Sequence, residues 1–220
     1  MDSVDSVDIT NNHKMIVACV LAAFDSGDLL HIGVSGKNAL PWKSMGDMKG
    51  FREVTIGDTG SPDNTTGKPQ DNAVIMGLQT WRSIPAKWRV LPKRLNIVLT
   101  SSLAQEERDK FPTVRFVATL DAALKCAASF KSDVAFIAGG RRLYEEAIQR
   151  NLAEVVFMTH ITFKEPTKFM AAEADVTLQK SLFAGFDQQV PALISGSEET
   201  DLGVLRFEMV RLTLQRKLVI

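Results

Sequence analysis

The sequence lacks an excess of charge of either sign, because 26 lysine and arginine residues balance 26 aspartate and glutamate residues. Binding to nucleic acid or to an anionic membrane usually depends on a broad positive field. The composition therefore predicts no nucleic-acid partner and no membrane partner.

Cysteine is scarce, and long apolar runs are absent. Cys19 and Cys126 lie far apart in apolar surroundings, and no Cys-x-x-Cys or Cys/His spacing indicates a zinc site or another metal centre. We expect both to be reduced core residues. No run approaches the roughly 20 apolar residues of a membrane span, and the start MDSVDSVDITNNHK lacks the basic head and apolar core of a signal peptide. These absences favour a soluble, cytoplasmic protein.

Proline and glycine are also modest, at 8 and 14 of 220 residues, and 45% of the chain is hydrophobic. This composition is typical of a globular protein with a substantial core. We expect a polar N-terminal tail over residues 1–13 and one domain over residues 14–220. Within that domain, residues 57–71 are rich in Gly, Pro, Asp and Thr and are expected to form a polar loop insertion.

Short apolar runs alternate with helical patterns. The windows 119–130 and 141–149 are predicted helices; the first has Thr119 as its N-cap, and apolar stripes fall at Leu120, Leu124, Ala127 and Ala128 and at Leu143, Ala147 and Ile148. The predicted strands cover residues 15–24, 72–76, 95–99, 114–117, 133–138 and 153–161.

This alternation predicts an α/β fold with a central, mainly parallel mixed β-sheet flanked by helices. Near the C-terminus, residues 186–195 and 204–212 resemble two strands on either side of the polar segment 196–203. We expect them to form an antiparallel hairpin that closes one edge of the sheet.

One acid stands in an unusual place. In the segment NALPWKSMGDMKGFR, a helix after Pro41 would put Met48, Phe51 and Val54 on one apolar face, with Asp47 at its edge. A carboxyl group there is either buried, with a partner or a raised pKa, or it is a solvated residue favoured by the helix N-terminus. This window alone leaves both interpretations open.

Two junctions between a strand and a helix contain glycine: VIMGLQTW at residues 74–81 and FIAGGRRLYEE at residues 136–146. Glycine lets the backbone approach a phosphate, and a helix N-terminus attracts the anion. Two such junctions suit a dinucleotide, although neither matches the GxGxxG fingerprint and a glycine pair is also common in tight turns.

Seven motifs follow one another along the chain: IGVSGKNALPW, the segment with Asp47 and MKGFR, VIMGLQTWRSIP, LPKRLNIVLTSS, FIAGGRRLYEE, VFMTHI and LRFEMV. In this order they closely resemble the dihydrofolate reductase family. The resemblance covers about residues 15–211. It implies an oxidoreductase that reduces 7,8-dihydrofolate to 5,6,7,8-tetrahydrofolate by hydride transfer from NADPH. This reaction serves one-carbon metabolism and is a target of antifolates.

The resemblance also implies roles for single residues. Asp47 matches the acid that faces the pterin ring, Thr159 the threonine that hydrogen-bonds it, and Trp42 the tryptophan that holds a nearby water, and these three are the candidate catalytic residues. Taken alone, Thr159 also fits an ordinary strand threonine and Trp42 a core aromatic. Arg94 matches the arginine that binds the carboxylate of the folate tail. The candidate substrate-binding residues are Leu40, Asp47, Met48, Phe51, Ile84, Leu91, Arg94, Ala138 and Thr159.

By the same resemblance, Gly139 and Gly140 are joined by a cis peptide, and the segment from Asp25 to Leu40 is a mobile loop that covers the nicotinamide. The candidate cofactor-binding residues are Ile32, Gly33, Gly77, Gln79, Thr80, Thr100, Ser101, Ser102, Gly139, Gly140, Arg141, Arg142, Leu143 and Tyr144.

The sequence departs from the family pattern at several positions, which include KFMAA at residues 168–172 in place of a Phe-Pro found in many members. Leu78 and Ala118 stand where basic residues usually meet the cofactor phosphates, so NADPH is expected but NADH stays open, with Arg141 and Arg142 as substitute cations. Gly50 replaces a bulky helical residue, which predicts a wider pocket for the folate tail.

Two other functions and two states of assembly stay open. The functions are a pyrimidine reductase of riboflavin synthesis with a related fold, which does not use the acid at Asp47, and a non-catalytic nucleotide-binding module. The chain is expected to be a monomer, or a domain separated from a fusion with thymidylate synthase.

Overall fold

The computed structural model describes residues 14–37, 39–57, 72–165 and 174–215. The expected tail over residues 1–13 and nearly all of the expected insertion over residues 57–71 lie outside this part of the chain. Among the described residues, no helix is long and apolar enough to cross a membrane.

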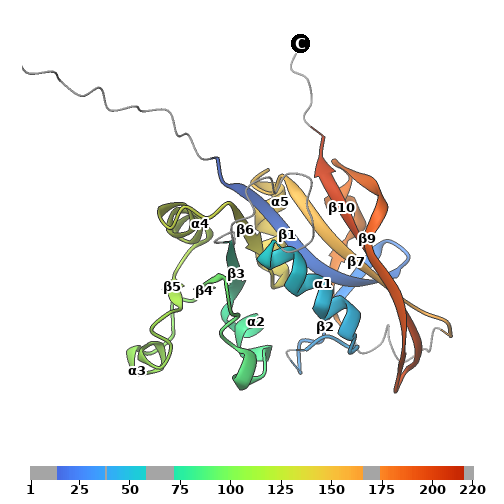
Figure 1. Ribbon diagram of the computed structural model, residues 1–220, viewed down its shortest axis with the longest axis horizontal. Coiled ribbons are helices and arrows are strands. Elements are labelled where there is room, and N and C mark those ends of the chain that lie inside the picture. The colour runs from blue at the N-terminus through green and yellow to red at the C-terminus, as the bar shows by residue number, and fades with distance from the viewer. Residues whose placement is uncertain (1–13, 38, 58–71, 166–173, 216–220) are drawn as a thin grey trace, which may run out of the picture.

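A ten-stranded mixed sheet forms the centre of the molecule (Figure 1). Its main path runs β5-β4-β3-β6-β1-β7-β10-β9, and β2 and β8 branch from β1. The strands are β1 Ile16–Ser26, β2 Leu29–Gly33, β3 Ala73–Gly77, β4 Leu95–Leu99, β5 Arg115–Val117, β6 Val134–Ile137, β7 Val155–Phe163, β8 Val176–Gln179, β9 Phe186–Thr200 and β10 Gly203–Leu214.

All pairs from β5 to β7 are parallel, whereas β10 joins β7 and β9 antiparallel. This confirms the predicted α/β architecture with a mainly parallel mixed sheet and a C-terminal hairpin. The hairpin strands are longer than expected. Residues 196–200, predicted as loop, continue β9, and only Asp201 and Leu202 form the turn.

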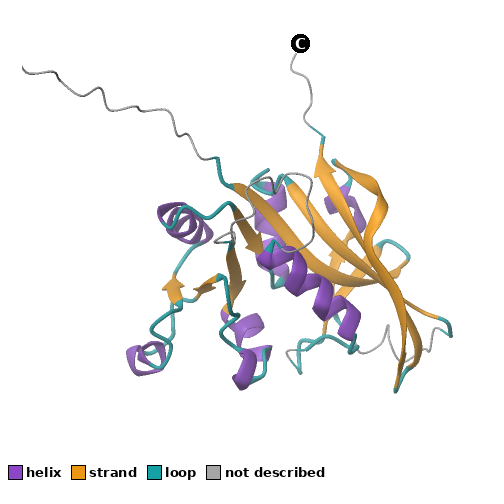
Figure 2. Cartoon of the chain, in the orientation of Figure 1, coloured by secondary structure: helices purple, strands orange, loops and turns teal. Residues whose placement is uncertain are grey.

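Helices cover both faces of the sheet (Figure 2). Residues of α4 and α5 pack with Cys19, Ile75 and Ile137 on one face, while α1 and α2 pack with Val20 and Val74 on the other. The helices are α1 Met45–Ile56, α2 Leu78–Ser83, α3 Gln105–Asp109, α4 Leu120–Ser129 and α5 Arg141–Gln149, with short 3-10 helices η1 Ala86–Trp88 and η2 Lys180–Phe183.

The two predicted helices are present. Thr119 caps α4, because its side chain accepts a hydrogen bond from the Ala122 N–H. The buried stripe of α4 differs from the prediction, since Ala123 is buried, Leu124 is only partly buried and Ala128 is exposed. In α5, the predicted residues Leu143, Ala147 and Ile148 are buried as expected.

The cysteines differ from each other. Cys19 is fully buried in β1, where burial raises the pKa of its thiol to about 12. Cys126 is only partly buried in α4, so the prediction of a core residue holds for Cys19 alone.

Candidate active site

Helix α1 buries its acid. Asp47 is only 8% exposed and shares the buried face of the helix with Gly50 and Val54, whereas Met48 is 61% exposed. The expected apolar face is therefore shifted by one position, and Asp47 lies within the buried face. Of the two interpretations left open by the sequence, the structure supports the buried carboxyl group.

The first turn of α1 holds this residue in place. Ser44 is the N-cap, and its Oγ accepts a hydrogen bond from the Asp47 N–H at 3.0 Å. The same hydroxyl donates to Glu198 Oε1 at 3.0 Å, which fixes the direction of the Ser44 O–H bond.

Burial is the main reason that the pKa of Asp47 lies above its ordinary value. The negative charge of Glu198 raises this pKa further, while the Thr159 side chain lowers it by favouring the charged form. Thr159 is fully buried in β7, between its register partners Ala22 and Met209. Its Oγ1 nevertheless makes no hydrogen bond of standard geometry with another described residue. We conclude that Thr159 lies near the carboxyl group but keeps unused hydrogen-bonding capacity.

The buried side chain of Trp42 also keeps unused hydrogen-bonding capacity. The ring is buried in a cluster with Ile161 and Phe207, yet its Nε1 lacks a hydrogen-bond acceptor within the described part of the chain. Buried polar atoms are usually paired with protein or ordered water. The orphaned polar atoms of Trp42 and Thr159 thus fit the binding of water or a polar ligand.

Arg94 precedes β4 and contacts the C-terminal half of α1. Its Nη1 donates to Thr55 Oγ1 at 2.6 Å, and its guanidinium lies 5.9 Å from the Phe51 ring centre. Asp47, Phe51 and Thr55 follow at positions i, i+4 and i+8, so Asp47 and Arg94 are separated by about 12 Å along the helix axis. Burial, and secondarily the charge of Arg52, lowers the pKa of Arg94 to about 10, which leaves it charged at neutral pH.

The predicted apolar residues fall into two groups by burial. Leu40 and Met48 are exposed, at 44% and 61%. The other four are partly buried and pack against the core cluster beneath α1 and α2: Phe51, Ile84, Leu91 and Ala138.

The prediction that Gly50 widens the pocket for the folate tail is wrong. A Cβ atom at Gly50 would lie 3.0 Å from Met209 Cε and 3.2 Å from Ile194 Cδ1. Gly50 therefore faces the C-terminal hairpin, and the absence of a side chain lets α1 pack closely on β9 and β10.

The two glycine junctions meet at the carboxyl ends of β3 and β6. The Gly77 N–H at the end of β3 donates to the Gly139 carbonyl oxygen at 2.8 Å, and Gly139 and Gly140 are joined by a cis peptide. Thr80 closes the other side, since a Cβ at Gly139 or Gly140 would lie 3.3 or 3.4 Å from its Oγ1. The result is a backbone cradle at the carboxyl ends of adjacent parallel strands.

Residues Thr100, Ser101 and Ser102 follow β4 at the same sheet edge, because Gly77 and Leu99 are register partners. Ser101 and Ser102 are exposed. Leu78 begins α2 and Ala118 follows β5, so the two positions that lack a cation also lie at this edge. Arg141 and Arg142 are exposed at the start of α5, and Arg141 Nε donates to Glu145 Oε1 at 2.8 Å.

Leu143 and Tyr144 belong to the core as well as to the start of α5. Tyr144 donates its hydroxyl hydrogen to the Val20 carbonyl oxygen at 2.9 Å. Burial, together with the charges of Cys19 and Asp47, raises its pKa, so the phenol stays neutral. Tyr144 thereby connects the glycine junction with the neighbourhood of Asp47.

The segment from Asp25 to Leu40 contains regular structure that the sequence did not reveal. It includes the end of β1 and all of β2, which pairs antiparallel with β1 and with β8. Ile32 and Gly33 end β2, and Ser35 beyond them donates from both N–H and Oγ to the Asp175 carboxylate. The first half of the expected loop is therefore a β-ribbon.

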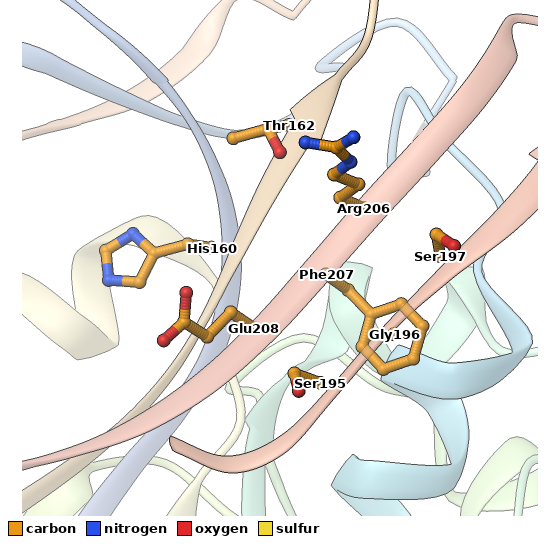
Figure 3. Close-up of a pocket in the computed structure, with 8 residues that line it drawn as sticks. All are labelled: His160, Thr162, Ser195, Gly196, Ser197, Arg206, Phe207 and Glu208. Atoms are coloured by element: carbon orange, nitrogen blue, oxygen red, sulfur yellow. The ribbon is translucent and has the colours of Figure 1, made fainter. Parts of the chain in front are cut away.

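A separate hollow of about 510 Å³ lies on the other face of the hairpin (Figure 3). His160 and Thr162 point into it beside Glu208 and Arg206, whereas their β7 neighbour Thr159 points to the opposite face toward Asp47. No predicted site residue lines this hollow, so it is distinct from the candidate active site.

Sequence reasoning missed Glu198, because it falls in the segment predicted as a loop. In the structure its carboxylate accepts hydrogen bonds from the Met45 N–H at 2.8 Å and the Gly46 N–H at 2.6 Å, besides the bond from Ser44. The only local signal was an acid among polar residues, which does not distinguish a cap from a solvated side chain.

Comparisons with known proteins agree with this geometry. The sequence profile of the dihydrofolate reductase family matches residues 62–184. A dihydrofolate reductase from Candida albicans is 31% identical over 153 residues, which cover 70% of this chain and 72% of that protein. A bifunctional dihydrofolate reductase-thymidylate synthase from Zea mays is 35% identical over 153 residues. That match covers 63% of this chain and 27% of the relative, so the chain spans about a quarter of the bifunctional protein's length.

The structure of Schistosoma mansoni dihydrofolate reductase superposes with a TM-score of 0.67 at 27% identity, covering 91% of this chain and 99% of that one. Sequence and fold thus agree on one family across most of the chain. The chain belongs to the dihydrofolate reductase family.

Proposed function

We propose that the protein reduces 7,8-dihydrofolate to 5,6,7,8-tetrahydrofolate with NADPH as the hydride donor. The observation that carries this proposal is the buried Asp47 carboxyl group, with its raised pKa, near the orphaned Thr159 hydroxyl. A buried carboxyl group whose pKa is perturbed is a common feature of functional sites.

Asp47 binds and orients the pterin ring in this proposal. The ring presents an N–H next to an amino group, and a carboxylate can accept hydrogen bonds from both with its two oxygens. A protonated ring nitrogen would favour the charged form of Asp47, so substrate and acid share one proton between them. Thr159 and a water near Trp42 complete the polar contacts at this end.

Arg94 binds the other end of the substrate. Its guanidinium lies about 12 Å along α1 from Asp47, which suits a molecule with a flat ring at one end and a carboxylate at the other. The forked donors of arginine fit a carboxylate well. The apolar residues between them, including Phe51, cover the middle of the ligand.

The glycine cradle fits the cofactor. Gly77 and Gly140 bring backbone close together without side chains, and the N-terminus of α5 at Gly140 has no side-chain cap, which suits a phosphate. When bound, NADPH supplies the hydride. Ile32 and Gly33 are proposed to lie over its nicotinamide, and Gln79 and Ser101 to Ser102 beside its phosphates.

We infer a preference for NADPH over NADH. The preference is weaker than cations at positions 78 and 118 would give, because Arg141 and Arg142 would have to bind the extra phosphate in their place. A cytoplasmic location follows as part of the same proposal. The bifunctional relatives support a domain from a fusion with thymidylate synthase as an alternative to a separate monomer.

The test is the loss of absorbance at 340 nm with dihydrofolate and either cofactor. We expect turnover with the wild-type protein, faster with NADPH, and a decrease in kcat of about 100-fold or more for Asp47→Asn. Asp201→Asn, in the exposed hairpin turn, is the matched control and should retain full activity. Equal activity of both variants would refute the role of Asp47, and no turnover by the wild-type protein would refute the function.

A further inference from the structure

Glu198 joins the C-terminal hairpin to the start of the helix that carries Asp47. Its two carboxylate oxygens accept three hydrogen bonds from consecutive residues, the Ser44 hydroxyl and the N–H groups of Met45 and Gly46. The first N–H groups of a helix have no partner inside the helix. Glu198, more than 150 residues away in sequence, supplies that partner from β9.

The same hydrogen bonds reach Asp47 indirectly. Ser44 donates its hydroxyl hydrogen to Glu198 and uses the oxygen to accept from the Asp47 N–H. Loss of the Glu198 acceptor would let the Ser44 hydroxyl rotate, and the cap on the Asp47 backbone would weaken. The position of Asp47 therefore depends on Glu198 through the Ser44 hydroxyl.

Packing reinforces this connection independently. The Phe207 ring of β10 lies against both Gly46 of α1 and Gly196 of β9. A Cβ at Gly196 would lie 2.7 Å from Phe207 Cζ, and a Cβ at Gly46 would overlap the same ring. Two glycines from distant parts of the chain thus admit one aromatic ring between the hairpin and the first turn of α1.

We propose that Glu198 is a positioning residue for the reduction, which couples the β9–β10 hairpin to the first turn of α1 and so fixes the Asp47 carboxyl group against the substrate ring. The inference rests on the proposed function. It adds a residue that acts through Ser44, Met45 and Gly46 and contacts neither substrate nor cofactor.

The charge of Glu198 has a second effect. Burial raises the pKa of Glu198, but its three hydrogen bonds outweigh burial and hold that pKa below the ordinary value, so the group is ionised at neutral pH. Its charge opposes ionisation of Asp47. The described groups that act on Asp47 are Glu198 from β9, Thr159 from β7 and Tyr144 from α5, and Tyr144 stays neutral.

Three variants separate the charge from the hydrogen bonds. Glu198→Gln removes the charge and places an amide donor near backbone N–H groups. Glu198→Asp keeps the charge but shortens the side chain. Glu199→Gln is the matched control, because Glu199 is an exposed neighbour on the same strand. Circular dichroism verifies that each variant is folded.

The first measurement is the NMR titration of the Asp47 carboxyl carbon in the ligand-free protein, which needs no activity. We expect Glu198→Gln to shift the midpoint to lower pH by about half a unit, as for a unit charge at close range in a partly solvated site. Glu198→Asp should shift it less, and Glu199→Gln should not shift it. A titration of Glu198→Gln that equals that of Glu199→Gln would overturn the proposal.

The second measurement is the pH profile of kcat and KM for dihydrofolate reduction in the steady state. Glu198→Gln should move the loss of activity at high pH to lower pH and reduce the rate about 5-fold at pH 7, with KM changed less than kcat. An unchanged profile with a shifted Asp47 titration would show that Glu198 does not serve the reaction, and this also overturns the proposal. If the wild-type protein does not reduce dihydrofolate, the proposed function fails, and the titration alone decides whether Glu198 controls Asp47.

Discussion

Asp47 is a carboxyl group in the buried face of α1, where Gly50 and Val54 are its neighbours. The sequence places it in the helix, but its pattern of Met48, Phe51 and Val54 suggests a different buried face. Burial raises the pKa of Asp47, which means that its charged form is less stable in the folded protein than in the unfolded chain.

This raised pKa makes stability depend on pH. Below the unfolded value of 3.8 the group is protonated in both states and has no effect. As pH rises from 3.8 through the raised pKa, the unfolded chain loses the proton first, so the folded protein loses stability. We therefore expect Asp47→Asn to be more stable than wild type toward urea at pH 7 and equally stable below pH 3.8. A constant difference at all pH values would contradict this explanation.

Arg94 offers a prediction about substrate binding. We propose that Arg94 donates two parallel hydrogen bonds to the tail carboxylate of the substrate. Arg94→Leu should then raise the KM for dihydrofolate about 30-fold with a small change in kcat, because tail binding is equal in the ground and transition states. Arg94→Lys keeps the charge but loses the fork, so the expected increase is about 10-fold. Steady-state kinetics over a range of substrate concentrations measures both. An equal KM for wild type and Arg94→Leu would exclude the assigned contact.

The orientation of α1 depends more on its contacts with other elements than on its own sequence. The helix has a good local cap in Ser44 and a C-terminal glycine, Gly57, with φ of 86° in the left-handed region. Its orientation depends on Gly46 and Gly50, which face Phe207 and Met209 of β10. Small residues at these positions let the helix approach the sheet.

Gly46→Ala tests this packing. Alanine favours the helix by up to about 1 kcal/mol, but its Cβ would overlap the buried Phe207 ring, and overpacking of this kind typically costs about 1–3 kcal/mol. We expect a net loss of stability in urea unfolding and lower activity, since the first turn carries Asp47. Met45→Ala, at a neighbouring side chain that is 75% exposed, is the control and should change stability little. A stabilised Gly46→Ala variant would show that α1 can shift without cost.

In the molecule as a whole, the proposed ligand sites span the sheet. The glycine cradle lies at the ends of β3 and β6, Thr159 lies in β7, and the Asp47 helix packs on β9 and β10. A ligand that contacts all of these elements binds only the folded protein, so binding and folding are linked.

Cofactor binding should therefore stabilise the entire fold. NADPH at 100 times its Kd should raise the free energy of unfolding by about 2.7 kcal/mol, which corresponds to an increase in Tm of about 5–10 °C for a chain of this size. NADH at the same concentration should raise Tm less. Thermal unfolding followed by circular dichroism measures the increase. Equal shifts with both cofactors would contradict the inferred preference for NADPH, because the extra phosphate would then find no cation.

Local patterns in the sequence were sufficient for much of the fold. Apolar runs of strand length located β4 and the cores of β1, β3, β6 and β7, and the spacing of Leu143, Ala147 and Ile148 located α5. These features depend on periodicity and capping, which act between residues close together in the chain. The candidate site residues came from the order of motifs, and their roles stay predictions.

Contacts between distant segments could not be found in this way. The pairing of β2 with β8, the extension of β9 through Glu198, and the Phe207 ring between Gly46 and Gly196 each join parts of the chain that no local pattern connects. Whether Asp47 is buried or solvated also depends on contacts between distant segments. It depends on which elements cover α1, because burial and the resulting pKa are properties of packed neighbours and not of the residue's own segment.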